Sequence, residues 1–178
     1  MLDRLHIGAL HVYQRLPTKG RRWVVRAIAP SFTVGAVCFI ERDDGAILLV
    51  RQRYRRRWGV PGGLLKRGED ASVAARREVL EEVGLQVELI GEPATVVDAA
   101  PQRVDLVYRA RPAPGSDLAA VTPSSPEILE TRWFPRDGLP ELQHETATAL
   151  VALARSAHSP QSPTTAGPPV PGVRSDPT

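Results

Sequence analysis

The chain of 178 residues has one cysteine, Cys38, only two lysines and no long apolar run. A single cysteine excludes an internal disulfide bond. No stretch reaches the ~20 apolar residues that a membrane-spanning helix requires, so we expect no membrane span. A charged start followed by an apolar run and a small-residue cleavage site is also lacking. Because 42% of the residues are hydrophobic, enough for a core, we expect one compact cytoplasmic domain with appendages.

The scarcity of lysine leaves arginine as the main basic residue, although the net charge is only +3. Five arginines fall within seven positions, and these are Arg51, Arg53, Arg55, Arg56 and Arg57. A planar guanidinium matches phosphate oxygens better than an ammonium group does. Two interpretations stay open: a charged hairpin strand held in water, and a surface that steers an anionic substrate. Under the second interpretation, Arg53 and Arg57 are candidate substrate-binding residues.

The composition divides the chain into three regions. Residues 1–29 carry apolar residues at helical spacing and then a basic stretch, which predicts an amphipathic helix and a linker. This helix could pack on the domain, pair with a second copy to form a homodimer, or touch an acidic surface. Residues 30–155 form the predicted domain. Residues 156–178 are rich in Pro, Ser and Thr without hydrophobic periodicity, and we predict a disordered tail.

Turn and capping residues divide the domain into elements. The turn residues Asp43, Asp44 and Gly45 predict a hairpin between strands 32–40 and 47–50. Residues 58–63 (WGVPGG) predict a tight loop, because proline and glycine interrupt regular structure. A helix over about 70–83, with Asp70 as N-cap, ends at Gly84. The remaining predictions are strands over 86–90 with 95–98, 104–110 and 128–134, and a helix over about 139–154.

On a helical wheel the 70–83 helix carries three carboxylates on one face. Glu78 and Glu82 lie within ~40° of each other, with Glu81 ~60° to the other side. The wheel predicts that Ala71, Ala74 and Ala75 share this face and leave room for an anion. It predicts that the opposite, core-facing side consists of Val73, Val79, Leu80 and Val83. The carboxylates repel one another, so a magnesium ion would compensate them. The alternative is a solvated acidic face neutralised by Arg76 and Arg77.

The spacing around these carboxylates favours the metal site. Gly63 is followed by five residues and Glu69, then seven residues and Arg77-Glu78, and the segment ends with Glu81-Glu82 and Gly84-Leu85. With aliphatic Val79 and Leu85 in place, this segment resembles the Nudix box, G-x5-E-x7-R-E-U-x-E-E-x-G-U, at every constrained position. The preceding hairpin, the WGVPGG loop and the late segment 126–134 also resemble the Nudix domain, so the likeness covers roughly residues 32–153.

The resemblance implies an α/β fold, an α/β/α sandwich around a mixed β-sheet. It implies a pyrophosphatase that hydrolyses nucleoside diphosphates linked to another moiety, with Mg²⁺ as cofactor and Mn²⁺ as a substitute. Carried over by position, the metal ligands are Glu78, Glu81, Glu82 and the carbonyl of Gly62, while Arg77 and Glu69 brace the helix and loop. The general base differs within the family, and the candidates are Glu81, then Glu78, then the late-loop Glu127. The alternative for Glu127 is an ordinary solvated acid, and Glu130 is its nearby competitor.

The substrate is less specified than the reaction. Pro101 lies sixteen residues after Leu85, a position at which ADP-ribose-specific Nudix enzymes carry proline. With Gly63 and Trp58 it completes the candidate substrate contacts, although Trp58 and Trp133 could equally be packing residues. ADP-ribose or a nucleotide sugar is the first hypothesis. The alternative is an oxidised nucleoside triphosphate, while a dinucleoside polyphosphate is less favoured because no tyrosine lies near Pro101.

Two other functions compete with hydrolysis. Isopentenyl-diphosphate isomerase has a similar domain and uses a cysteine acid, but Cys38 lies in an apolar strand that favours a core role. Some Nudix-fold proteins are non-catalytic ligand-binding modules, but these usually lose residues of the box, which is complete here. Because no helix-turn-helix or similar extension follows the domain, we expect a small-molecule nucleotide substrate and no stable nucleic-acid partner.

Overall fold

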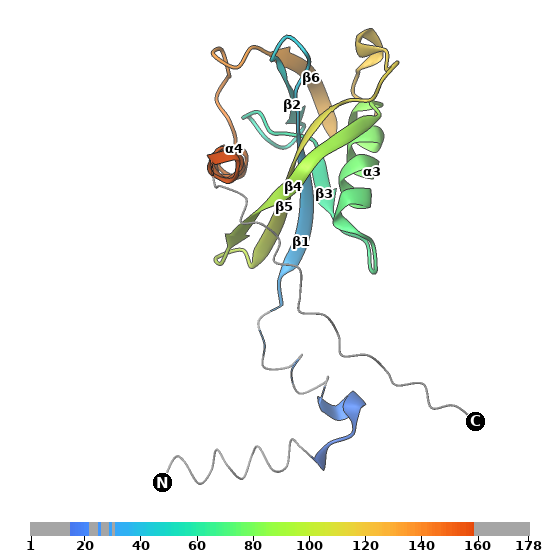
Figure 1. Cartoon of the computed structure of the whole chain (residues 1–178), viewed down its shortest axis with the longest axis vertical. Coiled ribbons are helices and arrows are strands. Elements are labelled where there is room, and N and C mark those ends of the chain that lie inside the picture. Colours follow the sequence, from blue (N-terminus) through green and yellow to red (C-terminus); the bar gives the residue numbers. More distant parts are fainter. Residues whose placement is uncertain (1–14, 22–24, 26–28, 30, 159–178) are drawn as a thin grey trace, which may run out of the picture.

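The computed structural model of the chain describes residues 15–21, 25, 29 and 31–158 (Figure 1). Most of the predicted N-terminal helix and nearly all of the predicted tail lie outside these residues. The elements, in chain order, are β1 (Thr33–Ile40), β2 (Ile47–Gln52), β3 (Gly62–Leu64), α3 (Ala71–Val83), β4 (Val87–Asp98), β5 (Arg103–Pro112), the 3₁₀ turn η1 (Leu118–Ala120), β6 (Ile128–Phe134) and α4 (His144–His158).

Two sheets lie between the helices α3 and α4, as Figure 1 shows. The larger sheet has the strand order β3-β1-β5-β4, and the smaller one pairs β2 with β6. The β1–β5 pair is parallel and the other pairs are antiparallel, so the larger sheet is mixed. The predicted α/β/α sandwich around a mixed sheet is therefore confirmed.

Strand β1 explains why both faces of the sheet are covered. Its alternate residues Ala36, Cys38 and Ile40 are buried in one core with Ala75 and Val79 of α3. The side chains between them enter a second core, in which Phe39 packs with Ala149 and Leu153 of α4. A strand that is apolar on both faces requires a covering element on each side.

The predicted hairpin is only partly correct. The turn forms, with Arg42 N–H bonded to the carbonyl of Ala46, and a single bridge joins Glu41 to Ile47. Beyond it the strands separate into different sheets. The edges of β1 are taken by β5 along its whole length and by β3 over residues 35–37, so β2 pairs with β6 instead.

Three other boundaries differ from the predictions. Residues 62–64 form β3 rather than part of a loop, because glycine lets this segment approach β1: a Cβ on Gly62 would lie 2.5 Å from the Ala36 carbonyl oxygen. The two parts of β4 are one strand, with a register shift between Ile90 and Ala94. Helix α4 begins at His144 rather than Leu139, since Glu141 and Gln143 bond to the backbone of Trp58. It also continues to His158, into the segment predicted as tail.

The predicted orientation of α3 is only partly correct, because Val79 and Val83 are fully buried as predicted but the other two core-facing residues are not. Val73 and Leu80 are 53% and 48% exposed, whereas Ala74 and Ala75 are fully buried. Glu82 is only 7% exposed and lies on the same side as these alanines. The alanines therefore leave no room for an anion but let the helix pack closely on β1 and β3. The wheel placed all three carboxylates on a solvent face, whereas Glu82 accepts a hydrogen bond from Gly62 of β3 and Glu78 lies against Gly63.

Candidate active site

The glycine pair of β3 lies between two carboxylates of α3. The Gly62 N–H donates to Oε2 of Glu82 at 3.0 Å. A Cβ on Gly63 would lie 2.5 Å from the carboxyl carbon of Glu78 and within 2.7 Å of both its oxygens. Only a residue without a side chain leaves space for that carboxylate. The close approach of β3 to α3 thus brings Glu78, Glu82 and the backbone of Gly62 together, as the sequence predicts.

Glu82 is an acid in an unfavourable environment. Burial raises its pKa to about 8, against the lowering effect of the hydrogen bond from Gly62, and repulsion by Glu78, Glu127 and Glu81 raises it further. A buried carboxylate surrounded by others takes up a proton unless a cation compensates its charge. Glu127, far away in the sequence, is thus one of the acids whose charge raises this pKa.

Arg77 joins these acids to the loop before α3. Its Nε and NH2 groups donate to Glu69 at 2.7 and 2.9 Å, and its NH1 group donates to Glu78 at 2.7 Å and Glu81 at 3.1 Å. The hydrogen bond from Arg77 lowers the pKa of Glu69 to about 2. Glu69 also accepts from the Lys66 N–H, which closes the loop. Arg77 and Glu69 therefore connect the loop to the helix.

The acids differ in how well they could hold a metal ion. Among the described residues, no three His, Cys, Asp or Glu side chains are already arranged as a metal cluster. Glu81 is 53% exposed and paired with Arg77 and Lys66, so it lies outside the buried pair. Glu78 and Glu82 offer hard oxygen ligands in a locally negative site, the donor chemistry that divalent cations such as magnesium take. These residues fit a divalent cation.

Glu127 reaches the site through the loop that precedes β6. Its backbone carbonyl accepts from the Arg53 N–H at 2.9 Å, and Arg53 Nε donates to the Pro126 carbonyl at 2.8 Å. These bonds place Tyr54 beside Glu127. Burial raises the pKa of the Tyr54 hydroxyl, and the charges of Glu127 and Glu82 and a hydrogen bond with Glu127 raise it too. Nothing in the arginine-rich surroundings of Tyr54 distinguishes this residue in the sequence.

The other acid near β6 has a different role. Glu130 accepts two hydrogen bonds from Arg51, the shorter at 2.7 Å, and lies 3.4 Å from Arg132. It is therefore held in an ion pair across the β2–β6 sheet. Glu127 forms no ion pair with the described residues, so it is the acid of this segment that is free to act at the site.

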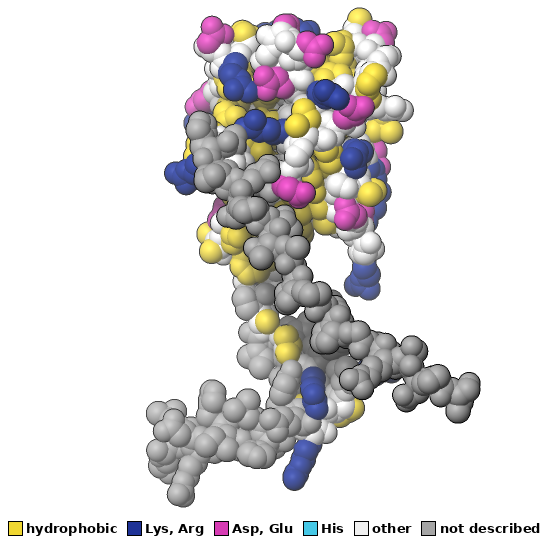
Figure 2. All heavy atoms as spheres, in the orientation of Figure 1, with side chains coloured by type: hydrophobic (Ala, Val, Ile, Leu, Met, Phe, Trp, Pro, Cys, Tyr) yellow, Lys and Arg dark blue, Asp and Glu magenta, His cyan; other side chains and the backbone are white. Residues whose placement is uncertain are grey.

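The arginine cluster is largely engaged with the protein itself. Arg55 pairs with Glu145 at 3.5 Å and Arg57 with Glu141 at 2.6 Å, and all four side chains are about half exposed or more. On the face seen in Figure 2, basic and acidic side chains alternate over the domain and do not form one basic area. Much of the basic charge predicted to meet the substrate is thus neutralised locally.

Two further residues predicted to contact the substrate, Trp58 and Pro101, make their contacts elsewhere in the fold. Trp58 packs edge-on against Phe134, with the ring centres 4.9 Å apart. Pro101 lies in the exposed turn between β4 and β5, whose Gln102 carbonyl accepts from Thr33 at the start of β1. The pair Ala36–Gly63 lies three residues further along β1, or roughly 10 Å. The structure therefore does not bring Pro101 to the glutamates.

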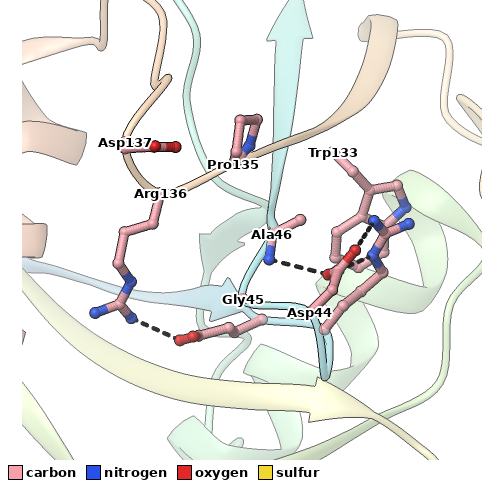
Figure 3. Close-up of a pocket in the computed structure, with 9 residues that line it drawn as sticks. Asp44, Gly45, Ala46, Trp133, Pro135, Arg136 and Asp137 are labelled. Atoms are coloured by element: carbon pink, nitrogen blue, oxygen red, sulfur yellow. Dashed lines mark hydrogen bonds and ion pairs between the residues drawn. The ribbon is translucent and has the colours of Figure 1, made fainter.

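A hollow of about 800 Å³ lies away from Glu78 and Glu82, between the 41–46 turn and residues 133–137 (Figure 3). Arg42 covers the ring of Trp133 at 4.9 Å, and the indole Nε1 is buried with no hydrogen-bond partner among the described residues. Arg136 pairs with Glu41 at 2.7 Å. No residue of the box lines this hollow, so its size does not make it the active site.

Cys38 has none of the properties of a catalytic acid. It is fully buried, and its Sγ lies 3.8 Å from the carbonyl oxygen of Ala75. Burial raises the pKa of its thiol to about 12. Its place in the core agrees with the structural role expected from the sequence.

Comparison with known proteins shows the family to which the chain belongs. The family model for the NUDIX domain matches residues 31–154, and the chain belongs to this family. Enzymes of the family are pyrophosphohydrolases that act on acid anhydrides. Residues of the chain also match a human protein, the 8-oxo-dGDP phosphatase NUDT18, with 34% identity over 130 residues, 69% of this chain and 38% of that protein.

Two further relatives act on different compounds. The CMP-5'-(N-acetyl-N-hydroxy-3-aminopropyl)phosphonate hydrolase of Streptomyces rubellomurinus is 31% identical, over 67% of this chain and 60% of that enzyme. A crystal structure of an ADP-ribose pyrophosphatase from Streptococcus suis has a TM-score of 0.58 and 25% identity, covering 72% of this chain and 94% of that one. The chain thus spans less than two thirds of the length of the human and Streptomyces proteins. In the part of the chain that the structure describes, no helix is long and apolar enough to cross a membrane.

Proposed function

We propose that the chain is a magnesium-dependent hydrolase that cleaves a phosphoanhydride bond in a nucleoside diphosphate linked to another moiety. The observation that carries this proposal is the convergence of Glu78 and Glu82 on the Gly62–Gly63 backbone, within a complete Nudix box. Glu78, Glu82 and the Gly62 carbonyl would hold the ion, and Mn²⁺ would substitute for Mg²⁺. We propose a cytoplasmic location for this activity.

The ion would neutralise charge on the diphosphate and lower the pKa of a bound water. The residues of the chain would hold the ligands of the ion in position. Arg77 orients Glu78, and through Glu69 it fixes the loop before the helix. The Gly62 N–H orients the carboxylate of Glu82. Together they hold the ligands in place before substrate arrives, so that little reorganisation is needed during the reaction.

We propose Glu127 as the general base, ahead of Glu81 and Glu78. The oxygen of a water molecule forms a bond to phosphorus, the bridging P–O bond breaks, and the water's proton passes to the carboxylate. Glu78 and Glu81 are both already engaged in ion pairs with Arg77. Glu127 has no such partner among the described residues and lies close enough to Glu82 to affect its pKa.

ADP-ribose or a nucleotide sugar is the first substrate hypothesis. The support is the Streptococcus suis ADP-ribose pyrophosphatase, whose crystal structure is similar to this fold, and the position of Pro101 sixteen residues after Leu85. An oxidised guanine nucleotide is the second hypothesis, supported by the likeness to the human 8-oxo-dGDP phosphatase. The two substrate classes differ in the group attached to the phosphoanhydride and in the nucleobase.

A substrate panel tests the proposal. ADP-ribose, UDP-glucose, 8-oxo-dGDP and 8-oxo-dGTP are incubated with the full chain in Mg²⁺, Mn²⁺ or chelator, and the products are separated by chromatography. We expect turnover that needs the metal, with AMP and ribose phosphate released from ADP-ribose. Equal turnover in chelator would rule out the metal mechanism. No turnover of any substrate, with metal bound, would favour a ligand-binding module.

A further inference from the structure

Gly35 of β1 lies beneath two charged side chains. One row across the larger sheet, on one face, consists of Leu64, Gly35, Asp105 and Val96. Val96 packs against the core that α4 covers, so this is the α4 side of the sheet. A Cβ on Gly35 would lie 2.8 Å from the NH2 group of Arg103 and closer still to a carboxylate oxygen of Asp105. The missing side chain thus leaves the space that these two charged groups occupy.

The hydrogen-bonding capacity of this pair is only partly used. The Nε group of Arg103 donates to the two carboxylate oxygens of Asp105 at 2.9 and 2.8 Å. Its NH1 and NH2 groups have no acceptor among the described residues. The side chains of Arg103 and Asp105 are 36% and 15% exposed, so both are partly shielded from water but reachable. A guanidinium held in a fixed direction therefore offers its remaining donors to a ligand.

Only the backbone of β3 separates this pair from the proposed metal ligands. A Cβ on Gly35 would lie 3.4 Å from the carbonyl oxygen of Gly63. Gly63 pairs with Ala36, the next residue of β1, so it faces the opposite side of the sheet, where it meets the Glu78 carboxylate. In the described part of the chain β3 is the edge strand of its sheet. A nucleotide with its phosphates at Glu78 could therefore pass around this edge and place its base at Arg103.

We propose that Arg103 and Asp105 recognise the nucleobase of the substrate and favour guanine over adenine. This inference rests on the proposed function, because it names the substrate class of that site. Asp105 already compensates the charge of the guanidinium, so the pair suits a neutral acceptor better than another phosphate. Guanine presents O6 and N7 as adjacent acceptors that match two guanidinium donors, whereas adenine has an amino donor in place of O6. Within the first substrate hypothesis, the pair favours a GDP-linked sugar over ADP-ribose.

The principal alternative is that the pair only stabilises the sheet. Loss of a structural ion pair would affect all substrates alike, whereas loss of a recognition pair would affect them according to the base. Arg111→Met is the matched control, because Arg111 also donates two hydrogen bonds, at 2.9 and 2.8 Å, to an acid on the β4–β5 ladder, Glu88. This control pair is more exposed and lies at the other end of β5.

Kinetics of the full chain on GDP-glucose and ADP-glucose, in saturating Mg²⁺, test the proposal with the sugar held constant. The wild type should favour GDP-glucose in kcat/KM by about tenfold or more. Arg103→Met should raise the KM for GDP-glucose about tenfold and change that for ADP-glucose less than about twofold. Arg103→Lys keeps the charge without the planar fork and should not restore the preference. Arg111→Met should keep it.

A second variant and a binding measurement complete the test. Gly35→Ala should displace the pair and reduce the same preference. Calorimetric binding of GMP and AMP, in chelator, gives a readout independent of turnover, and GMP binding should be tighter and be weakened by Arg103→Met. Equal use of both sugar nucleotides by the wild type, or equal losses for both in Arg103→Met, would overturn the inference and leave the hydrolase standing. Selective GMP binding without any turnover would uphold base recognition and contradict the proposed function.

Discussion

The Nudix box and the arginine-rich loop 53–57 are both dense in charge but use it in different ways. In the box, Glu82, Glu78 and Arg77 have side chains mostly shielded from solvent, and each contacts the others or the glycine backbone. In the loop, the pairs of Arg55 and Arg57 are about half exposed or more. Shielded charges depend on one another strongly, whereas exposed pairs are screened by water. The comparison predicts that substitutions in the box have much larger effects than substitutions in the loop.

The largest effect is expected for Glu82→Gln. It retains the shape of the side chain and removes the charge that would hold the metal ion, so kcat should fall by about two orders of magnitude or more. Turnover of the wild type and variant at saturating Mg²⁺ measures the loss. Glu88→Gln, which removes an exposed acid paired with Arg111 on β4, is the matched control and should change kcat little. Wild-type turnover of Glu82→Gln would contradict the catalytic assignment.

The next effect is steric and concerns Gly63→Ala. The new methyl group would overlap the Glu78 carboxylate, since its nearest atom would lie at 2.5 Å. We expect the carboxylate to move, with a loss of roughly 10- to 100-fold in kcat and weaker metal binding. Gly20→Ala is the control, because its Cβ would meet no described atom closer than 3.5 Å. If metal titration gave the wild-type affinity for Gly63→Ala, Glu78 would not be a ligand of the metal ion.

A pH effect should follow from Glu82 in the metal-free chain. The pKa of its carboxyl group is about 8 in the folded chain, above the ~4.3 of an unfolded glutamate. Between these values the folded state holds a proton that the unfolded state releases, so the free energy of unfolding falls as pH rises. Thermal unfolding in chelator should therefore give a lower Tm at pH 8.5 than at pH 5.5, and Glu82→Gln should reduce this difference.

Magnesium provides the complementary measurement. The metal binds the ionised carboxylate, so its stabilising effect on Tm should grow over the same pH interval. If the difference in Tm with and without Mg²⁺ were the same at pH 5.5 and pH 8.5, the ion would not be bound by Glu82.

The smallest effects are expected in the loop. Arg57→Ala and Glu141→Ala each break an exposed ion pair, and each should change the free energy of unfolding by less than ~1 kcal/mol. The KM of both variants should stay within about twofold of the wild type. A large rise in KM for Arg57→Ala alone, with Glu141→Ala normal, would mean that Arg57 contacts the substrate. That result would break the contrast between the two regions.

Local signals account for the parts of the molecule that could be predicted. The N-cap Asp70, whose side chain accepts from the Ser72 N–H, and the left-handed Gly84 mark the ends of α3 within one residue of the predicted range. The two-sided apolar pattern of β1 predicts a buried strand, and the box spacing predicts which acids converge. These features depend on neighbours in the sequence.

Features that depend on distant contacts could not be predicted in the same way. Whether β1 pairs with β2 is decided by β5, which is far away in the sequence. The side of α3 that faces the sheet is decided by the glycines of β3, which accept buried carboxylates that a helical wheel assigns to solvent. The start of α4 is decided by bonds from residues 141–143 to Trp58.

The parallel pairing of β1 with β5 also has a consequence for how the chain folds. Thr33 pairs with Arg103, seventy residues later, and the whole box lies between them. Closing so long a loop has a large entropy cost before any contact is gained, so folds of this kind form slowly. Helix α3 packs on β1, and β1 has its longest partner in β5. During synthesis on the ribosome the glutamates proposed to hold the metal would therefore exist for some time as an exposed acidic segment, and they would come together only after residue 112 had emerged.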